Sequence, residues 1–349
     1  MRKSPLFDLA AALPEHLAYG VDAGRNLGGL PQRSDIDNIV ILGMGAARTA
    51  GQVVRALSST VIPVPILVES SYEIPACVGK RSLVYAISGS GNTDEVNHTA
   101  AKSAAVGAQL IVVTVGGWLV DFARDRQSPV VHIPPDIQPA RAAFGVMVAS
   151  LLTTLGEIGF LPEAGSWVES AVLQLRRRHE DLCREDNVAK RLASVLIGRH
   201  VLCQGDTPIG ATAAERWKAQ INQNAKQCAS SSEQPNASHN EAVAWDSQDD
   251  RISQNEVVVL LRHAYEDPRV RQRIDRLAGY LNGKVPVHSV HGEGDSRLAV
   301  LMDLVMLGDF TSLHLAAQNG VDPCTIPFIS ETLKEGLAPP DHGKQTVGS

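Results

Sequence analysis

The sequence predicts an α/β protein with two parallel sheets, each flanked by helices. Short apolar runs alternate with helical patterns along most of the chain, which is typical of βαβ units around a parallel sheet. The length of 349 residues favours two domains over one, since a single core rarely organises so long a chain. A charged helical stretch over residues 163–190 separates two such series and reads as a bridge between them.

The strand candidates are short runs rich in β-branched residues and bounded by turn residues. They comprise residues 38–43, 64–69, 83–88, 109–115 and 129–133 in the first half, and 200–205, 256–262, 285–290 and 324–329 in the second. The apolar stretch 142–161 approaches membrane length, but Glu157 and frequent small polar residues interrupt it. We therefore expect a buried helix there.

These patterns divide the chain into five parts. We expect an N-terminal helical segment, a first α/β domain, a helical linker, a second α/β domain and a frayed tail, over residues 1–34, 35–160, 161–195, 196–337 and 338–349. A long polar insert, residues 227–251, interrupts the second series. Polar loops of this length are often functional or unstructured.

The composition excludes some classes of function. The chain is 44% hydrophobic and 20% charged with a net charge of −6, so it lacks the basic surface that nucleic-acid binding needs. Its one basic run, residues 176–179, fits a solvated helix face. Five scattered cysteines without a CxxC pair, and a start without a secretion signal, predict reduced thiols in a cytoplasmic protein with no membrane contact.

The segment "AISGSGNTDEVNHTA", residues 86–100, combines the end of a strand, a Gly/Ser turn and the start of a helix. Exposed amides and the helix dipole can bind an anion at such a turn, and hydroxyl groups can add hydrogen bonds. The alternative is an ordinary turn in which a Ser or Thr caps the helix. The residues alone leave both interpretations open.

Two other features belong to the same predicted sheet edge. The turn Gly43–Gly45 follows the first strand, and Arg141 follows the last strand of the first series. Arg141 could hold an anion or stabilise developing negative charge, or it could form a salt bridge at a helix start. The chain contains no Walker A sequence and no zinc-binding histidine spacing. We expect neither a metal nor a cofactor.

The combined motifs resemble a known family. "GMG" after the first strand, "SGSGNT" after the third, "QPARAAFG", "INQNAKQCA…SHNEAVAW" and "NGVDPCTIPFISETLKEGL" together resemble the bifunctional phosphoglucose/phosphomannose isomerases, which have the sugar isomerase (SIS) fold. The resemblance covers about residues 35–337. It implies two SIS domains, a homodimer, and metal-independent interconversion of glucose 6-phosphate or mannose 6-phosphate with fructose 6-phosphate.

The resemblance also implies roles for individual residues. The residues that would bind the phosphate lie in the two loops and are Gly45, Ser88, Ser90, Asn92 and Thr93. The catalytic side chains would include Arg141, Lys334 and a histidine from a neighbouring subunit, His239. The arginine would stabilise the enediolate, and the histidine would assist ring opening.

Gln223 is the main departure from the family pattern. The family has a glutamate base in an "NENAK" motif sixteen residues before the histidine, where this chain reads "NQNAK". An amide forms hydrogen bonds but cannot take and return a proton near neutral pH. The first loop also lacks the serine of the family's "GMGGS", and Ala140 is an extra residue within the "QPR" turn.

Three interpretations follow from these departures. The protein is an isomerase with another base, for which Glu215 and Glu241 are the available carboxylates; it binds a phosphosugar without turning it over; or its chemistry has changed. We expect the first, because Arg141, His239 and Lys334 are all retained.

Overall fold

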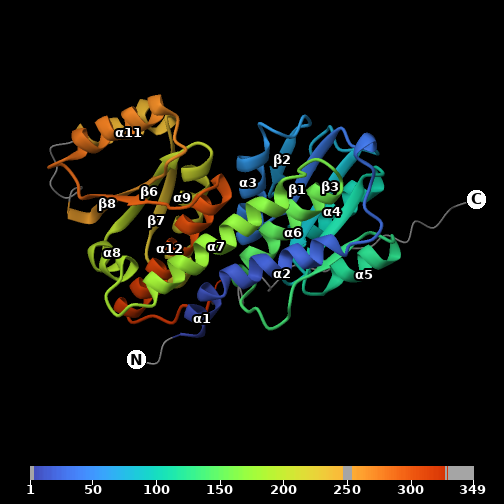
Figure 1. Ribbon diagram of the computed structural model, residues 1–349, viewed down its shortest axis with the longest axis horizontal. Coiled ribbons are helices and arrows are strands. Elements are labelled where there is room, and N and C mark those ends of the chain that lie inside the picture. Colours follow the sequence, from blue (N-terminus) through green and yellow to red (C-terminus); the bar gives the residue numbers. More distant parts are fainter. Residues whose placement is uncertain (1–3, 247–253, 327, 329–349) are drawn as a thin grey trace, which may run out of the picture.

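The computed structural model describes residues 4–246, 254–326 and 328. It confirms an α/β fold with two parallel sheets, which lie side by side along the long axis of the molecule (Figure 1). The first sheet contains β1 (Asn38–Gly43), β2 (Ile66–Glu69), β3 (Ser82–Ser88), β4 (Gln109–Thr114) and β5 (Val130–His132). The second contains β6 (His200–Asp206), β7 (Ala229–Gln234), β8 (Glu256–Arg262) and β9 (Val287–His291).

Helices flank both sheets and fill the space between them. In the first half they are α1 (Pro5–Ala11), α2 (Leu13–Arg25), α3 (Ala46–Ser58), α4 (Asp94–Ala105), α5 (Trp118–Asp125) and α6 (Phe144–Glu157). In the second half they are α7 (Ala164–Leu182), α8 (Val188–Leu196), α9 (Ile209–Gln220), α11 (Pro268–Leu281) and α12 (Arg297–Gln318). Short helical turns η1 (Arg33–Asp35), η2 (Ala140–Ala143), η3 (Ile221–Ala225), η4 (Asn236–His239) and η5 (Glu241–Asp246) connect them.

In the first sheet the chain adds β2 on one side of β1 and then β3 on the other, so the direction of strand addition reverses there. The order is β2-β1-β3-β4-β5, with every pairing parallel, and Gly43 at the end of β1 lies opposite Ile87 near the end of β3. All residues of both central strands are buried, as expected for strands covered by helices on both faces. Chain segments that leave the two strands therefore emerge side by side.

The structure corrects three sequence-based expectations. β7 lies within the polar insert 227–251 and pairs with β6, although its sequence, "ASSSEQ", carries no apolar alternation. The predicted strand 324–329 is wrong for residues 324–326, which have no strand structure. The bridging stretch 163–190 is interrupted, because α7 ends at Leu182 and α8 begins at Val188 after a cap by Asn187.

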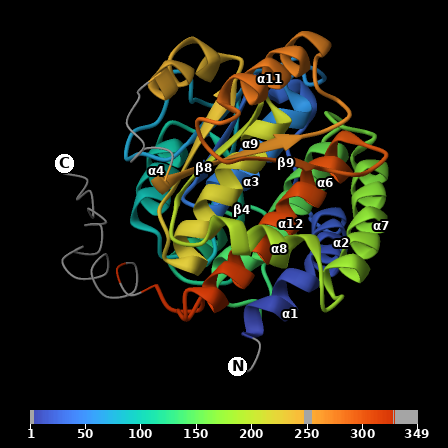
Figure 2. The same ribbon diagram turned by 90° about the vertical axis from the view of Figure 1, so that its left-hand side faces the viewer.

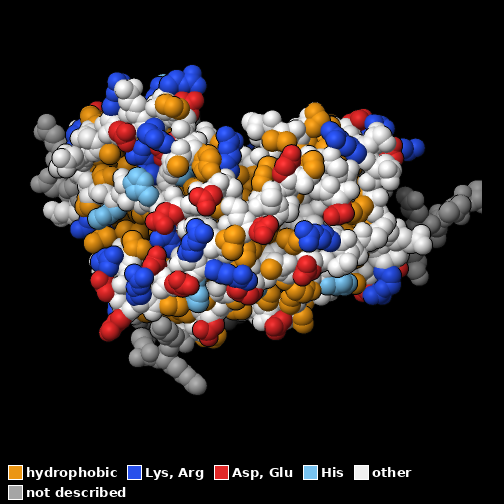
Figure 3. Space-filling model, viewed as in Figure 1, with side chains coloured by type: hydrophobic (Ala, Val, Ile, Leu, Met, Phe, Trp, Pro, Cys, Tyr) orange, Lys and Arg blue, Asp and Glu red, His pale blue; other side chains and the backbone are white. Residues whose placement is uncertain are grey.

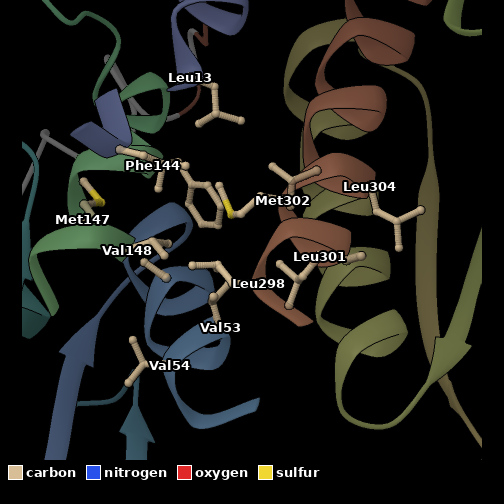
Figure 4. Packing of buried hydrophobic residues seen from close by; sticks show 14 of the residues in the cluster. Leu13, Val53, Val54, Phe144, Met147, Val148, Leu298, Leu301, Met302 and Leu304 are labelled. Carbon is tan, nitrogen blue, oxygen red and sulfur yellow. The ribbon is translucent and has the colours of Figure 1, made fainter. Parts of the chain in front are cut away.

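One apolar core runs through both halves of the molecule. Buried residues of β1 and β3 belong to the same cluster as those of β6 and β8. Leu13 of α2, Val53 of α3, Phe144 of α6 and Met302 of α12 meet within it (Figure 4). The predicted buried helix in 142–161 is confirmed as α6, of which twelve consecutive residues, 144–155, are buried.

Helix α12 packs against α7, α8 and α9 at the centre of the second half (Figure 2). Among the described helices it alone is long and apolar enough to cross a membrane, but 94% of its apolar window is buried inside the protein. It also carries two buried acids. Arg178 of α7 donates two 2.7 Å hydrogen bonds to Asp303, and Arg216 of α9 donates two, of 3.0 and 2.9 Å, to Asp309. These ion pairs fix α12 between its neighbours.

We predict that Asp303→Ala lowers the free energy of unfolding by about 3–5 kcal/mol, because it leaves the buried guanidinium of Arg178 with only the exposed Glu293 as a carboxylate partner. Urea denaturation measures the change. Asp121→Ala is the control, since the Asp121–Arg124 pair is exposed and its loss should change stability by less than about 1 kcal/mol. Equal effects of the two substitutions would show that the buried pair does not hold α12.

Candidate active site

Two loops form the floor of the candidate site at the carboxyl edge of the first sheet. The loop Gly43–Gly45 follows β1 and leads into α3, and the loop Ser88–Thr93 follows β3 and leads into α4. They are neighbours because β1 and β3 are paired, and connections run away from this point in opposite directions. Ligands of open α/β sheets bind at such a switch point. Gly45 has a φ of +54°, a value that favours glycine, at the N-cap of α3.

The second loop presents hydroxyl groups next to an uncapped helix start. The hydroxyls of Ser88 and Thr93 share a 2.7 Å hydrogen bond, and the Ser88 hydroxyl also accepts from the amide of Gly91 at 3.0 Å. Ser90 is exposed, and its hydroxyl accepts from the amide of Asn92 at 3.2 Å. Thr93 occupies the N-cap position of α4 but its side chain makes no capping hydrogen bond. Thr93 therefore does not cap α4, whereas the Ser88 and Ser90 hydroxyls bond within the turn.

Arg141 in η2 is 7% exposed and is held by residues of the second half. Its Nε and Nη2 atoms both donate to Oδ1 of Asn224 at 3.2 Å, and Nη2 donates to the carbonyl oxygen of Pro323 at 2.6 Å. Its Nη1 atom is buried and has no hydrogen-bond partner among the described residues. Burial, and then the nearby Arg216, lower the pKa of Arg141 to about 10. No ion pair of Arg141 forms with the described residues, so the salt-bridge alternative finds no support.

Gln223 lies in the π-helical turn η3, next to the residue that holds Arg141. It is half-buried, and its side-chain amide makes no hydrogen bond with a described residue. Asn224 donates through Nδ2 to the hydroxyl of Ser312 on α12 at 2.9 Å, which orients the amide that accepts from Arg141. Lys226 donates to the carbonyl oxygens of Gln223 and Thr325 at 2.6 Å each. Burial and then Arg141 lower the pKa of Lys226 below that of an exposed lysine.

A close contact joins the Ser88–Thr93 loop to the turn that carries Arg141. A Cβ atom built on Gly89 would lie 2.3 Å from Cβ of Ala140, well inside van der Waals contact. Only glycine fits at this position while alanine occupies position 140. The extra residue of the "QPARAAFG" segment therefore packs directly against the loop.

Comparisons with known proteins place this chain in a family. Residues 185–337 match the family described as the bacterial phospho-glucose isomerase C-terminal SIS domain. A bifunctional phosphoglucose/phosphomannose isomerase of Caldicellulosiruptor bescii is 33% identical over 342 residues, which cover 95% of this chain and 99% of that protein. The chain belongs to the bifunctional phosphoglucose/phosphomannose isomerase family.

Other relatives agree with this assignment. A protein of Aquifex aeolicus with the same name is 32% identical and covers 86% of this chain and 90% of its own length. The C-terminal domain of glucosamine-fructose-6-phosphate aminotransferase from Francisella tularensis superposes with a TM-score of 0.69 over 92% of this chain and 97% of that one. That pair is 13% identical, so it shows the shared SIS fold alone. At the family level this chain is a divergent phosphosugar isomerase.

The structure brings together some of the predicted site residues. The two loops, with Gly45, Ser88, Ser90, Asn92 and Thr93, lie on one sheet edge, and the Gly89–Ala140 contact adds the Arg141 turn. The Arg141–Asn224 hydrogen bonds bring in the motif that contains Gln223. Lys334 lies outside the described residues.

His239 is not joined to this group within one chain. It is exposed in η4, beyond the edge strand β7, and the contact described for it is a 3.0 Å hydrogen bond from Nη1 of Arg273 on α11.

Neither carboxylate considered as a replacement base is free. Glu215 on α9 forms an ion pair with Arg48 at the start of α3. Glu241 accepts a 3.2 Å hydrogen bond from Nε2 of Gln204 on β6. Both side chains therefore have structural partners away from Arg141.

The sequence analysis missed the polar residues that hold Arg141. Asn224 stands in the "NQNAK" motif next to Gln223, but nothing in the motif predicts that its amide bonds to Arg141. Ser312 lies in a mostly apolar helix, α12, and no sequence signal distinguishes it from the other polar residues there. Its contact with Asn224 depends on the packing of α12 against η3.

The corresponding edge of the second sheet is closed by its own buried polar pairs. His263, after β8, is buried with Asp206 at the end of β6, with 2.6 Å between Nε2 and Oδ1. Nδ1 of His263 accepts from the amide of Tyr265, so Nε2 carries the proton and donates it. Arg262 donates two hydrogen bonds to the buried Glu266. Within the described ranges, no cluster of three or more metal-ligating side chains could hold a metal ion.

We predict that Gly89→Ala destabilises the protein by about 1–3 kcal/mol because the new methyl group overlaps Ala140. The double variant Gly89→Ala/Ala140→Gly should recover most of this loss, since the overlapping atom is removed. Thermal and urea unfolding of the four proteins in the double-mutant cycle measure the coupling. Independent, additive effects would contradict a direct contact between the loop and the Arg141 turn.

Proposed function

We propose that the protein is an aldose–ketose isomerase of hexose 6-phosphates that interconverts glucose 6-phosphate or mannose 6-phosphate with fructose 6-phosphate. The substrate phosphate would bind at Ser88, Ser90 and Thr93, with Asn92 and the amides near Gly45 completing the pocket. Proton transfer between C1 and C2 would pass through an enediol, whose negative charge Arg141 would stabilise.

The observation that carries this proposal is the buried Nη1 atom of Arg141, which has no hydrogen-bond partner among the described residues. A buried N–H group without an acceptor destabilises the fold, and a bound ligand that accepts from Nη1 would remove this cost. The rest of the guanidinium is held by Asn224 and Pro323, which fixes its plane. An oxyanion of the substrate is the kind of acceptor that such a group fits.

We further propose a cytoplasmic homodimer that works without a metal. His239 would enter the site of a second subunit, because within its own chain it lies beyond β7 and contacts Arg273. The exposed position of His239 and the neighbouring exposed Val243 are compatible with burial against a second copy. Lys334 would complete the site.

A second function, binding without turnover, is favoured by the chemistry of position 223. Gln223 cannot act as the base, and Glu215 and Glu241 are engaged with Arg48 and Gln204. The loops and Arg141 would still bind a phosphosugar. The two functions share the same bound ligand and differ only in whether a proton is transferred.

We predict that Gln223→Glu raises the isomerase activity by at least tenfold, since general-base catalysis contributes about 10²–10⁴-fold. A coupled assay with fructose 6-phosphate, glucose 6-phosphate and mannose 6-phosphate, run on both proteins, measures this. Clear turnover by the wild type supports the isomerase and excludes binding alone. A silent wild type beside an active variant supports binding without turnover. Silence from both would contradict an intact site.

We predict that Asn224→Ala weakens binding of 5-phosphoarabinonate, a sugar-acid analogue of the enediolate, by about 10–100-fold, because hydrogen bonds to a charged group contribute about 1.5–3 kcal/mol. Binding of fructose 6-phosphate should weaken less, since its phosphate is held by the loops. Isothermal titration calorimetry compares the two ligands. Asn222→Ala, in the same motif but exposed and away from Arg141, is the control. Equal losses for both ligands would mean that Asn224 supports the fold and does not position Arg141.

A further inference from the structure

A second cleft, of about 560 Å³, opens between the two halves of the molecule. One wall is a face of α3, and the other is formed by the start of α9 and by β7. Helices α3 and α9 lie side by side at the junction in Figure 1, and the molecular surface is notched between the two halves in Figure 3. None of the described residues assigned above to the phosphosugar site lines this cleft.

Polar groups without partners face this space. Gln52 on α3 lines the cleft, is 7% exposed, and its amide makes no hydrogen bond with a described residue. The hydroxyl oxygen of Ser232 on β7, from the opposite wall, is buried and also has no partner. Buried polar groups are nearly always hydrogen-bonded, and leaving one unpaired costs about 1–3 kcal/mol. The Ser232 hydroxyl is such a group, and a ligand that pairs with it could also bond to the nearly buried Gln52 amide on the facing wall.

The charged residues of the cleft define the ligand further. Arg55 is exposed at the rim, lies one turn from Gln52 and Ser59 on the same face of α3, and forms no ion pair with a described residue. Arg48 is already neutralised by Glu215, and this pair closes the end of the cleft next to the Gly45 loop. The wall opposite Arg55 carries the exposed Glu233, whose carboxylate forms no ion pair with a described residue and attracts hydrogen-bond donors. The ligand must therefore be anionic at one end and rich in hydroxyl groups at the other.

We propose that this cleft is a second binding site, separate from the phosphosugar site, for a phosphorylated sugar or polyol. Its phosphate binds to Arg55 and Ser59, and its hydroxyl groups bind to Gln52, Ser232 and Glu233. The cleft volume is within the range of small-molecule sites. The ligand contacts both halves at once, and it touches α3, which begins at the Gly45 loop, and α9, which continues into the turn with Gln223.

The inference does not depend on the proposed function, and the test separates the two sites. Ser90→Glu places a carboxylate in the exposed part of the first loop, which repels phosphate there. Isothermal titration of fructose 6-phosphate into this variant should still show one site per chain. Adding Arg55→Ala should weaken that binding by about 10–100-fold, as expected for the loss of a charged hydrogen bond. Arg177→Ala is the matched control and should change nothing. Arg177 is an exposed arginine on α7 that forms no ion pair with a described residue.

Three results would overturn the proposal. The first is a Ser90→Glu variant that binds no fructose 6-phosphate while circular dichroism shows it folded. The second is residual binding that Arg55→Ala and Arg177→Ala affect equally, which places the ligand elsewhere. The third is inorganic phosphate binding to Ser90→Glu as tightly as fructose 6-phosphate, which leaves no role for Gln52, Ser232 and Glu233 in binding hydroxyl groups.

Discussion

The shared apolar core is the constraint on which the rest of this structure depends. Because residues of both sheets and of α6 and α12 belong to one buried cluster, the two halves pack as parts of a single interior. The two buried arginine–aspartate pairs, Arg178–Asp303 and Arg216–Asp309, add direction to this non-directional packing. Arg216 also lies over the ring of Phe144 at 4.5 Å, so the second pair links the α9–α12 contact to α6.

The candidate site is assembled by this packing and not by either sheet alone. The phosphate-type loops belong to the first sheet, whereas Asn224 and Pro323, which hold Arg141, come from the second half. Ser312 of α12 then holds Asn224. Every step from the core helix to the guanidinium is a hydrogen bond between buried groups, and in a low-dielectric interior such bonds strongly favour one arrangement. Arg141 is therefore positioned before any ligand arrives.

The two sheet edges show how the same topology can be used differently. Parallel strands end in both, yet the first edge presents glycines and hydroxyls, and the second is closed by His263–Asp206 and Arg262–Glu266. Burial alone would raise the pKa of Glu266, but its hydrogen bonds from Arg262 and from the amide of His263 outweigh burial and lower it. The second edge is thus a stable polar interior, which leaves the first edge for ligand chemistry. At the first edge, glycines and hydroxyl groups stand where the family resemblance implies phosphate binding, and Gln223 in η3 stands where it implies a glutamate.

The sequence by itself determined the fold class, most strands and the position of the Ser88–Thr93 loop between a strand and a helix, because these depend on local patterns: buried β-branched runs and a Gly/Ser turn before a helix. The roles of Arg141 and of Gln223 at the position of the family's base stay predictions from the family resemblance. The sequence analysis missed β7, whose "ASSSEQ" sequence forms a strand only because β6 offers a free edge for pairing. Only the tertiary structure decided that Thr93 does not cap α4, that Asn224 and Ser312 hold Arg141, and that Glu215 and Glu241 are already paired. Except for the local Ser88–Thr93 bond, these facts depend on contacts between residues that lie 37 to 167 positions from each other in the chain. No pattern within a short window of sequence encodes which distant partner a side chain will meet.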